Sequence, residues 1–352
     1  ANNNKHTGPN VPALRFPEFS GEWEKVLLSS ACEINPKTGS LDNQFLYIDL
    51  ESVVKGSLVK RQIIEKDGAP SRAQRVLKEN DILYQCVRPY QLNNYIFEGD
   101  TIQCVASTGY AQLRTTQFPL YIFQALHTKQ FTKQVLERCT GTNYPAINSS
   151  DLGTVEVPIC SLPEQVKIGS LLALIDSRIK TQSKIIEEQE TLLKSLADSL
   201  ISSQVANMAL NDCVVARSSA MKESELENPG PFPVFGASGL CGYNNEALEE
   251  SDSILVTKDG SGVGTCQYAT GAHSFLGTLC SLTAKDGVYL PYVYYALLNF
   301  NFASFKTGLA IPHIYFKDYG KAVIYCPSYD EQVRIASGLE KLEAKINTDK
   351  EL

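Results

Sequence analysis

The stretch "VTKDGSGVGTC" at residues 256–266 is the clearest candidate for a cofactor-binding loop, because Gly260, Gly262 and Gly264 follow an expected strand. Glycine-rich turns bind cofactor phosphates when a helix starts directly after them, since the helix N-terminus attracts anions. Here the glycines are followed by "TCQYATGAHSF", which has turn and strand character, and no Gly-Lys-Ser/Thr motif occurs. The pattern therefore predicts a hairpin loop rather than a methyltransferase-type cofactor site.

Hydrolytic or metal-dependent chemistry has no stronger support. A metal-dependent nuclease needs clustered carboxylates, but Glu343-Ala344-Lys345 lies in a helical pattern where exposed charge is expected. Neither His273 nor His313 has a flanking nucleophile motif. The ten cysteines stand singly without a Cys-x-x-Cys pair, and only four histidines are present, which argues against a zinc site. We expect a protein with no catalytic residues, metal or cofactor of its own.

The composition is that of a soluble globular protein, with 43% hydrophobic and 20% charged residues among 352. No segment has the apolar length of a signal peptide or membrane span, so we expect a cytoplasmic protein with reduced thiols. The net charge of −7 argues against a positive coat for indiscriminate nucleic-acid binding. A local basic stretch, "VKRQIIEKDGAPSRAQRVLK" at residues 59–78, is compatible with a nucleic-acid contact or with a solvated surface hairpin.

The chain contains an internal repeat. Residues 140–179, "TGTNYPAINSSDLGTVEVPICSLPEQVKIGSLLALIDSRI", align without a gap with residues 307–346, "TGLAIPHIYFKDYGKAVIYCPSYDEQVRIASGLEKLEAKI", at an offset of 167. The identical positions include Thr140/Thr307, Gly141/Gly308, Pro145/Pro312, Ile147/Ile314, Asp151/Asp318, Gly153/Gly320, the Glu-Gln-Val run at 164–166 and 331–333, and Ile168/Ile335. An ungapped register of this length predicts an internal duplication.

The end of each copy has the heptad pattern of a coiled-coil helix. Its apolar residues alternate steps of four and three, which keeps one seam against a partner helix. The apolar seam residues are Ile168, Leu172, Ile175, Ile179, Ile186, Leu193, Leu196 and Leu200 in the first copy and Ile335, Leu339, Leu342 and Ile346 in the second. Gln182 and Gln189 interrupt the seam, which weakens packing but fixes register and partner.

Before each helix lies a region of short strands, turns and short helices. Strands are expected at 80–87 and 252–258, and helices at 119–138 and 291–305. Residues 106–114 and 274–282 are a further pair of similar segments in the two halves. The expected order is an N-terminal segment (1–23), a domain (24–160), a central spacer helix (161–207), a second domain (208–327) and a short closing helix (328–352). This order predicts an α+β chain. Two mixed α/β domains are separated by long, antiparallel coiled-coil helices, with internal duplication and pseudo-two-fold symmetry.

Several segments occur in a characteristic order, namely "PALRFPEFSGEWEKVLLSSACEI", "NDILYQCVRP", "ASTGYAQLR", "GTNYPAIN", "LPEQVKIGSLLALIDSRI" and the second copy. In this order they resemble the specificity (S) subunit of type I restriction–modification systems, and the resemblance covers nearly the whole chain. It implies a non-catalytic DNA-binding subunit whose two target-recognition domains each read half of a bipartite sequence. It also implies that the helical spacers dock two methyltransferase subunits, which methylate adenine with S-adenosylmethionine, and that translocase–nuclease subunits join this core.

The helical pattern agrees with this function on physical grounds. The seam from Ile168 to Leu200 would be about 50 Å long at the rise of an α-helix. That length corresponds to about one and a half turns of duplex DNA. Two domains held apart by a stiff helix are expected to read half-sites separated by a gap of fixed length and unspecified sequence.

The basic side chains are expected to bind phosphates, and the polar and aromatic ones to read base edges. In the first domain we predict backbone contacts from Lys60, Arg61, Arg72 and Arg75, and base contacts from Arg88, Tyr90, Gln91, Asn93, Asn94, Asn143 and Tyr144. In the second domain the predicted DNA-binding residues are Lys258, Ser261, Lys306, Thr307, His313, Tyr315 and Lys317. Ordinary turn chemistry explains the amide-rich loop at 87–95 equally well.

Two further points stay open in the sequence. Because the closing helix is short, residues 182–200 have no obvious partner within the chain, and we hypothesise that a methyltransferase subunit or a second copy covers them. A self-contained methyltransferase or nuclease is one alternative. The sequence contains no Asn/Asp-Pro-Pro-Tyr/Phe motif, which argues against methyltransferase activity. A coiled-coil adaptor that binds only proteins is another, and salt-dependent DNA binding would exclude it.

Overall fold

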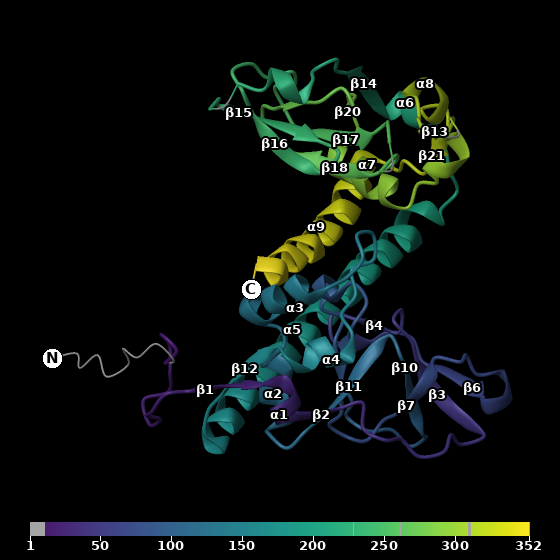
Figure 1. Ribbon diagram of the computed structural model, residues 1–352. Helices are drawn as coiled ribbons and strands as arrows, with labels where there is room; N and C mark the ends of the chain where they lie inside the picture. Colours follow the sequence, from purple (N-terminus) through teal and green to yellow (C-terminus); the bar gives the residue numbers. More distant parts are fainter. Residues whose placement is uncertain (1–10, 228, 261, 309–310, 352) are drawn as a thin grey trace. The chain divides into compact units, whose positions relative to one another are not determined.

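The computed structural model describes residues 11–227, 229–260, 262–308 and 311–351 (Figure 1). The chain divides into two compact units, a first unit of residues 1–179 and a second unit of residues 180–352. Each unit has its own sheets and its own hydrophobic core. No helix in these described ranges is long and apolar enough to cross a membrane.

Two four-stranded sheets form the body of the first unit. One has the order β6 (Gln62–Glu65), β3 (Gln44–Ile48), β10 (Cys104–Ser107) and β7 (Ala73–Val76). The other has the order β2 (Cys32–Ile34), β11 (Tyr110–Thr115), β8 (Ile82–Gln85) and β9 (Tyr95–Ile96). Small pairs are β1 (Glu24–Leu27) with β12 (Glu156–Ile159) and β4 (Val53–Val54) with β5 (Ser57–Leu58). Strand β8, "ILYQ", is buried along its whole length, as expected for a central strand rich in apolar residues.

The helices of the first unit pack on the sheet that contains β8. They are α1 (Leu28–Ala31), α2 (Pro119–Ala125), α3 (Lys129–Arg138) and α4 (Ser149–Gly153), followed by the start of α5 (Leu162–Ala197). Tyr84 of β8 meets Phe131 of α3 edge to face, with ring centroids 5.8 Å apart. The single helix predicted at 119–138 is two helices, because the Thr128 side chain accepts the backbone N–H of Phe131 and so begins a new helix.

The second unit repeats this topology. One sheet has the order β14 (Val214–Ser218), β20 (Leu279–Ala284), β17 (Ser253–Thr257) and β18 (Cys266–Ala269), and the other β16 (Gly239–Asn244), β15 (Phe232–Gly236) and β19 (Ser274–Phe275). Strand β13 (Met208–Ala209) pairs with β21 (Val323–Ile324). The parallel pairing of β15 with β19 matches that of β3 with β10. The predicted duplication is therefore confirmed, and its echoed segments are β10–β11 and β19–β20.

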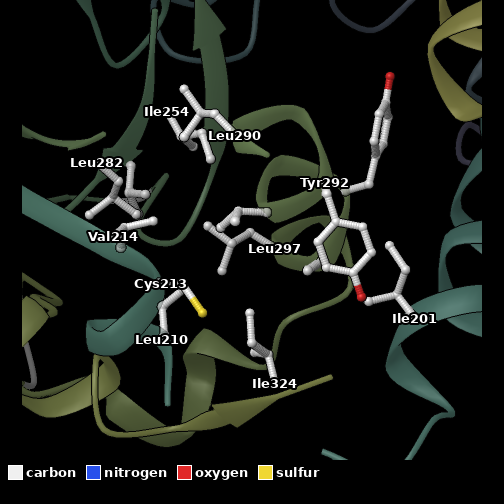
Figure 2. Close-up of a cluster of buried hydrophobic side chains, with 14 of the residues drawn as sticks. Ile201, Leu210, Cys213, Val214, Ile254, Leu282, Leu290, Tyr292, Leu297 and Ile324 are labelled. Carbon is white, nitrogen blue, oxygen red and sulfur yellow. The ribbon is translucent and has the colours of Figure 1, made fainter. Parts of the chain in front are cut away.

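The core of the second unit lies between its sheet and its helices (Figure 2). The helices are α6 (Leu210–Cys213), α7 (Leu290–Leu298), α8 (Phe316–Tyr319) and α9 (Tyr329–Glu351). Figure 2 shows Ile254 and Leu282 of the sheet gathered with Leu290 and Leu297 of α7. Burial of such aliphatic side chains stabilises the fold by about 1.5–3 kcal/mol each.

Helix α9 is the partner of the second half of α5, and the two helices run antiparallel as predicted (Figure 1). The Gln182 amide donates to the backbone carbonyl of Asp349 (3.1 Å), and the Gln189 amide donates to the Asp349 carboxylate (2.9 Å). Lys350 pairs with Glu190 at 2.6 Å. The hypothesis that residues 182–200 lack a partner within the chain is therefore wrong, and the two seam glutamines fix the partner that they were expected to specify.

The predicted seam of α5 is wrong at four positions. Ile175 and Ile179 are 45% and 58% exposed, and the end of the seam is shifted by one residue. Leu196 and Leu200 are 38% and 39% exposed, whereas Ala197 and Ile201 are buried. The step from Leu193 is thus four residues instead of three, and the helix continues through a π-helical turn at Asp198–Ser202. Ile335, Leu339 and Ile346 of α9 are buried, and Leu342 packs at the edge of the core, as the heptad pattern predicted.

Each long helix is fixed to its own unit by a buried glutamine near its start. In the first unit, Gln165 accepts the backbone N–H of Phe118 (3.1 Å) before α2 and donates to the carbonyl of Cys160 (2.8 Å). In the second unit, Gln332 accepts the N–H of Tyr289 (2.9 Å) before α7 and donates to the carbonyl of Pro327 (2.8 Å). The Glu-Gln-Val repeat is thus a joint between helix and domain.

The residue before this glutamine differs between the copies. Glu164 is buried and receives two hydrogen bonds of 2.7 Å from the Arg15 guanidinium. The Trp23 indole also donates to it at 3.3 Å. The counterpart Glu331 lies at the surface, and its one ion pair with a described residue is with Arg334, one turn away on α9. Arg15 and Trp23, in the segment before β1, therefore hold the start of α5 through Glu164, and we call this contact the clasp. The described residues form no equivalent contact at Glu331.

Candidate nucleic-acid interface

In the first unit, two loops lie side by side where β8 ends, and we call residues 86–94 and 140–147 the first loop pair. The Ile147 N–H donates to the Cys86 carbonyl at 3.0 Å, and the Arg88 N–H donates to the Pro145 carbonyl at 2.7 Å. Thr140 and Ala146 exchange two backbone hydrogen bonds of 2.9 Å. Main-chain bonds therefore fix the shape of the loops independently of most of their side chains.

The second unit contains the same arrangement where β17 ends, and the described residues of 258–264 and 307–314, which leave out 261, 309 and 310, form the second loop pair. The Ile314 N–H donates to the Lys258 carbonyl at 3.0 Å, and the Gly260 N–H donates to the Pro312 carbonyl at 3.1 Å. Thr307 and His313 exchange backbone bonds of 2.9 and 2.8 Å. The glycine-rich stretch at 256–266 is the connection between antiparallel β17 and β18, so the predicted hairpin is confirmed.

Both loop pairs turn at the repeated glycine. Gly141 and Gly308 each have φ 89°, in the left-handed region where a side chain is unfavourable. A Cβ at Gly141 would lie 3.1 Å from the Tyr144 carbonyl oxygen, and one at Gly308 would lie 2.4 Å from that of Ile311. The glycine of the Thr-Gly repeat is therefore required by backbone geometry.

Three predicted arginines gather near the first loop pair. The Arg88 guanidinium carbon lies 4.3 Å from the centre of the Tyr144 ring, a cation–π contact, and Tyr144 is 64% exposed. Exposed Arg72 and half-buried Arg75 are tied to the same region, because the Arg72 carbonyl accepts the N–H of Thr108 in the turn beside Cys86. Burial lowers the pKa of Arg75. Within the described ranges, no carboxylate pairs with any of these arginines.

The amide side chains of the first loop pair are used largely within the fold. Asn94 is 1% exposed; its oxygen accepts the Gln85 N–H (2.8 Å), and its nitrogen lies 3.2 Å from Nε2 of His127. The prediction that Asn94 faces a base is therefore wrong, because both of its polar atoms are bonded in the interior. The Asn93 side-chain oxygen accepts a hydrogen bond from the backbone N–H of Lys55, and the Gln91 side-chain oxygen accepts one from the Gln85 side-chain amide. Tyr90 and Asn143 are exposed at the loop surface, where their predicted roles stay open.

Two predicted phosphate-binding residues have carboxylate partners. Lys60 lies 3.6 Å from Asp49, and Arg61 lies 2.6 Å from Asp100. A phosphate would have to compete with these carboxylates, so the basic stretch at 59–78 offers less free positive charge than its sequence indicates. Exposed surface pairs of this kind contribute at most about 1 kcal/mol, so they can be exchanged.

The second loop pair presents a different set of side chains. Nδ1 of His313 lies 2.6 Å from the Asp259 carboxylate, and the Lys317 ammonium lies 5.3 Å from the centre of the Tyr315 ring. Lys258 is half-buried, whereas Lys306 and Thr307 are exposed. The predicted residue Ser261 lies outside the described residues. The other predicted residues of this domain thus lie on or next to one loop pair.

Sequence analysis missed two basic residues beside the first loop pair. Lys129 and Lys133 on α3 line an open groove together with Leu92, at the end of the loop after β8. A lysine at i and i+4 on a short helix is an ordinary surface pattern, so only the packing of α3 against the loop reveals their position.

The thiols and carboxylates of the described residues give little support for catalysis. Burial raises the pKa of Cys86 to about 11 and that of Cys266 to about 12, which keeps both thiols protonated near neutral pH. In the part of the chain that the structure describes, no three His, Cys, Asp or Glu side chains group as metal ligands would.

Comparison with known proteins agrees with this geometry. Residues 20–191 and 203–352 match the type I restriction modification DNA specificity domain. The chain is 24% identical over 162 residues to the type I restriction enzyme HindI specificity subunit of Haemophilus influenzae, and 22% identical over 117 residues to the EcoprrI specificity subunit of Escherichia coli. These alignments cover 44% and 33% of this chain and only 32% and 29% of the two relatives.

Solved structures share the fold. The crystal structure of the type I restriction–modification S subunit from M. genitalium has a TM-score of 0.67 at 20% identity, covering 94% of this chain and 91% of that one. A structure from a study of complex assembly and conformational transition of the type I R-M system has a TM-score of 0.51 at 19% identity, with 96% and 93% covered. With a DNA specificity domain matched in each half and a duplicated fold shared with an S subunit, the chain belongs to the family of type I restriction–modification DNA specificity proteins.

Proposed function

We propose that this protein is the subunit that gives a type I restriction–modification complex its DNA specificity, and that it reads a bipartite target with one loop pair per half-site. The observation that carries the proposal is the duplicated loop pair, with the same backbone in each unit and different side chains. A shared backbone gives both units the same way of approaching DNA, while different side chains give each unit its own sequence preference.

The first loop pair has the side chains that such a role needs. Arg72, Arg75 and Arg88 supply positive charge on a protein whose net charge is −7. Exposed Tyr90, Tyr144 and Asn143 supply aromatic and hydrogen-bonding surface for base edges. Lys129 and Lys133 on α3 would add positive charge beside this loop pair, and Lys133 would have to exchange its 4.0 Å pairing with Glu137 for a phosphate.

Helix α5 offers a surface for the methyltransferase subunits that the function requires. The exposed apolar residues on one side of this helix are Leu171, Leu174, Ile175, Ile179, Ile185, Leu192, Leu196 and Leu200. Leu174 is 69% exposed, and a stripe of this length is typical of a protein-binding surface. We infer that methyltransferase subunits cover this stripe. S-adenosylmethionine and the methyl-transfer chemistry then belong to those partners, and DNA cleavage to translocase–nuclease subunits.

The test is single-molecule methylation sequencing of cells that express the methyltransferase subunits with and without this chain. We expect methyladenine at one split motif, with a gap of fixed length, only when the chain is present. An unchanged methylome, together with no salt-dependent DNA binding by the complex, would overturn the proposal in favour of a protein-binding adaptor.

The docking surface is tested separately by co-purification. Leu174→Lys places a charge in the apolar stripe, and we expect it to reduce capture of the methyltransferase subunit. Thr191→Lys is the matched control, because Thr191 is exposed on the opposite side of the same helix. Equal capture by both variants would show that the stripe is not the docking surface.

A further inference from the structure

The two loop pairs place different side chains on equivalent backbone positions. The bridge between Val87 and Ala146 in the first unit corresponds to the bridge between Asp259 and His313 in the second. By the same hydrogen-bond pattern, Arg88 corresponds to Gly260, since each donates its N–H to the proline carbonyl of the facing loop. Any role of the Arg88 side chain is therefore specific to the first unit.

The backbone at Arg88 is unfavourable for arginine. Arg88 has φ 54° and ψ 54°, a left-handed conformation that is uncommon for residues other than glycine, asparagine and aspartate. Its counterpart Gly260 has φ 95°. Strained residues of this kind persist where the surrounding structure holds them, and they cluster at functional sites. The strain at Arg88 gives no gain to the fold that glycine would not give.

The Arg88 side chain is held in place but is left without a polar partner. Its Nε is buried and receives no hydrogen-bond partner from the described residues. The ring of Tyr144 lies 4.3 Å from the guanidinium carbon and limits its orientation. Arg15 and Arg114 of the first unit differ, since each binds a buried carboxylate at 2.7 Å. Arg75 shares a buried Nε without a partner among the described residues, but no aromatic ring of these residues lies against its guanidinium. Arg88 is thus an oriented guanidinium whose binding capacity the fold does not use.

We propose that Arg88 is a specificity-determining residue of the first unit and that it recognises a guanine in the first half-site. This inference rests on the proposed function. A guanidinium held in one plane matches the O6 and N7 acceptors on the major-groove edge of guanine, which arginine contacts with two parallel hydrogen bonds. An oriented fork also fits a phosphate, but only a base contact makes the preferred DNA sequence depend on residue 88.

The experiment compares the methylated motif of the wild-type complex with those of Arg88→Lys and Arg88→Gly complexes. We expect one guanine position in one half-site to become degenerate, while the other half-site and the gap stay unchanged. Lysine keeps the charge but lacks the fork, and glycine is the residue that the equivalent position already carries. A thermal unfolding midpoint no lower than that of the wild type is expected for Arg88→Gly, which separates loss of reading from loss of folding.

Binding measurements complete the test. Affinity of the Arg88→Gly complex for its cognate site is expected to fall about 5- to 150-fold, while affinity for a site mutated at that guanine stays unchanged. An equal loss on all sequences, with a shallower salt dependence, would show a phosphate contact and overturn the inference. An unaltered motif in both variants would also overturn it. If the wild-type complex methylates no split motif, the proposed function itself fails, which is a distinguishable result.

Discussion

At the scale of single residues, the backbone turn of each loop pair depends on a glycine with the same left-handed φ, Gly141 in one unit and Gly308 in the other. Replacing Gly141 by alanine forces a Cβ into a left-handed conformation 3.1 Å from the Tyr144 carbonyl. We expect Gly141→Ala to lower the free energy of unfolding by about 1–3 kcal/mol. Gly308→Ala is expected to lower it more, since its Cβ would lie 2.4 Å from the Ile311 carbonyl.

Chemical denaturation measures both effects, and Gly338→Ala is the control. Gly338 lies within α9, where an added Cβ meets no atom within 4 Å. Because alanine is a better helix former than glycine, this substitution should raise stability by about 0.5–1 kcal/mol. If Gly141→Ala also raised stability, the loop backbone would differ from the one described.

The buried pair of Arg15 and Glu164 yields a second prediction. Arg15→Met leaves the Glu164 carboxylate buried, and among the described residues the Trp23 indole is then its one side-chain partner. An uncompensated buried charge costs about 3 kcal/mol or more, so we expect a large loss of stability in urea unfolding. Arg334→Met removes the partner of the equivalent but exposed Glu331, and should change stability little. Equal effects of the two variants would contradict the clasp at the start of α5.

The sequence alone did not predict which polar side chains of the first loop pair are exposed. The run "QLNNY" places Gln91, Asn93 and Asn94 in one polar loop, and spacing alone treats their amides alike. Asn94 points inward because it meets His127, which lies 33 residues away in the turn between α2 and α3, and the local sequence does not specify this contact. The sequence also did not show that Arg88 occupies a left-handed backbone position, where glycine would be expected, because this is known only from its φ and ψ angles.

At the scale of elements, heptad spacing predicted both long helices because periodic burial is a local property of the sequence. It predicted neither the four-residue step from Leu193 to Ala197 nor the partner of Gln182. Those depend on how α9 packs, and Asp349 follows the last predicted seam residue, Ile346, by three positions.

The contact between α5 and α9 predicts a pH effect. The hydrogen bond from Gln189, with Lys345 beside it, lowers the pKa of Asp349 from its usual value of 3.8. The folded state therefore binds this proton less readily than the unfolded state, and the contribution of Asp349 to stability is lost as the pH falls below 3.8. We expect Asp349→Asn to be less stable than the wild type at pH 7 and nearly as stable at pH 3.

Urea unfolding midpoints at the two pH values check this expectation. Asn keeps the size of the side chain but not its charge, so the comparison isolates ionisation. The same difference between variant and wild type at pH 7 and pH 3 would show that the Asp349 carboxylate contributes nothing through its charge.

At the scale of the whole molecule, α5 is one continuous helix of 36 residues that begins in the first unit and ends in the second. Inserting one heptad after Lys180 would lengthen it by about 10 Å and nearly preserve the orientation of its seam. If the helix sets the spacing of the half-sites, the gap in the methylated motif should grow by about three base pairs. Methylation sequencing of the variant complex measures the gap.

A second insertion is the control for the first. Seven residues placed after Asp286, in the exposed turn before α7, lengthen the chain without lengthening α5. The gap should then stay unchanged. A gap that does not respond to the heptad in α5 would mean that something other than this helix measures the distance.

The duplication was predictable from the sequence because the two copies keep the same residue types, at a constant offset of 167, where the fold requires a particular backbone angle, hydrogen bond or apolar contact. Thr-Gly, the buried Gln165 and Gln332, and the apolar seam are such positions. The strands between them share topology with little shared sequence, because many apolar residues fill a central strand equally well. The pairing of β15 with β19, for example, became visible only in the structure.

The main-chain bonding of the loop pairs has a consequence for how such a protein changes over generations. Since backbone groups hold the loops together, positions 144, 259 and 313 contribute little to folding and can accept new side chains at low cost. The same frame already holds arginine with tyrosine in one unit and aspartate with histidine in the other. A lineage can therefore acquire a new DNA target by a few substitutions in one loop pair, while the rest of the molecule is inherited intact.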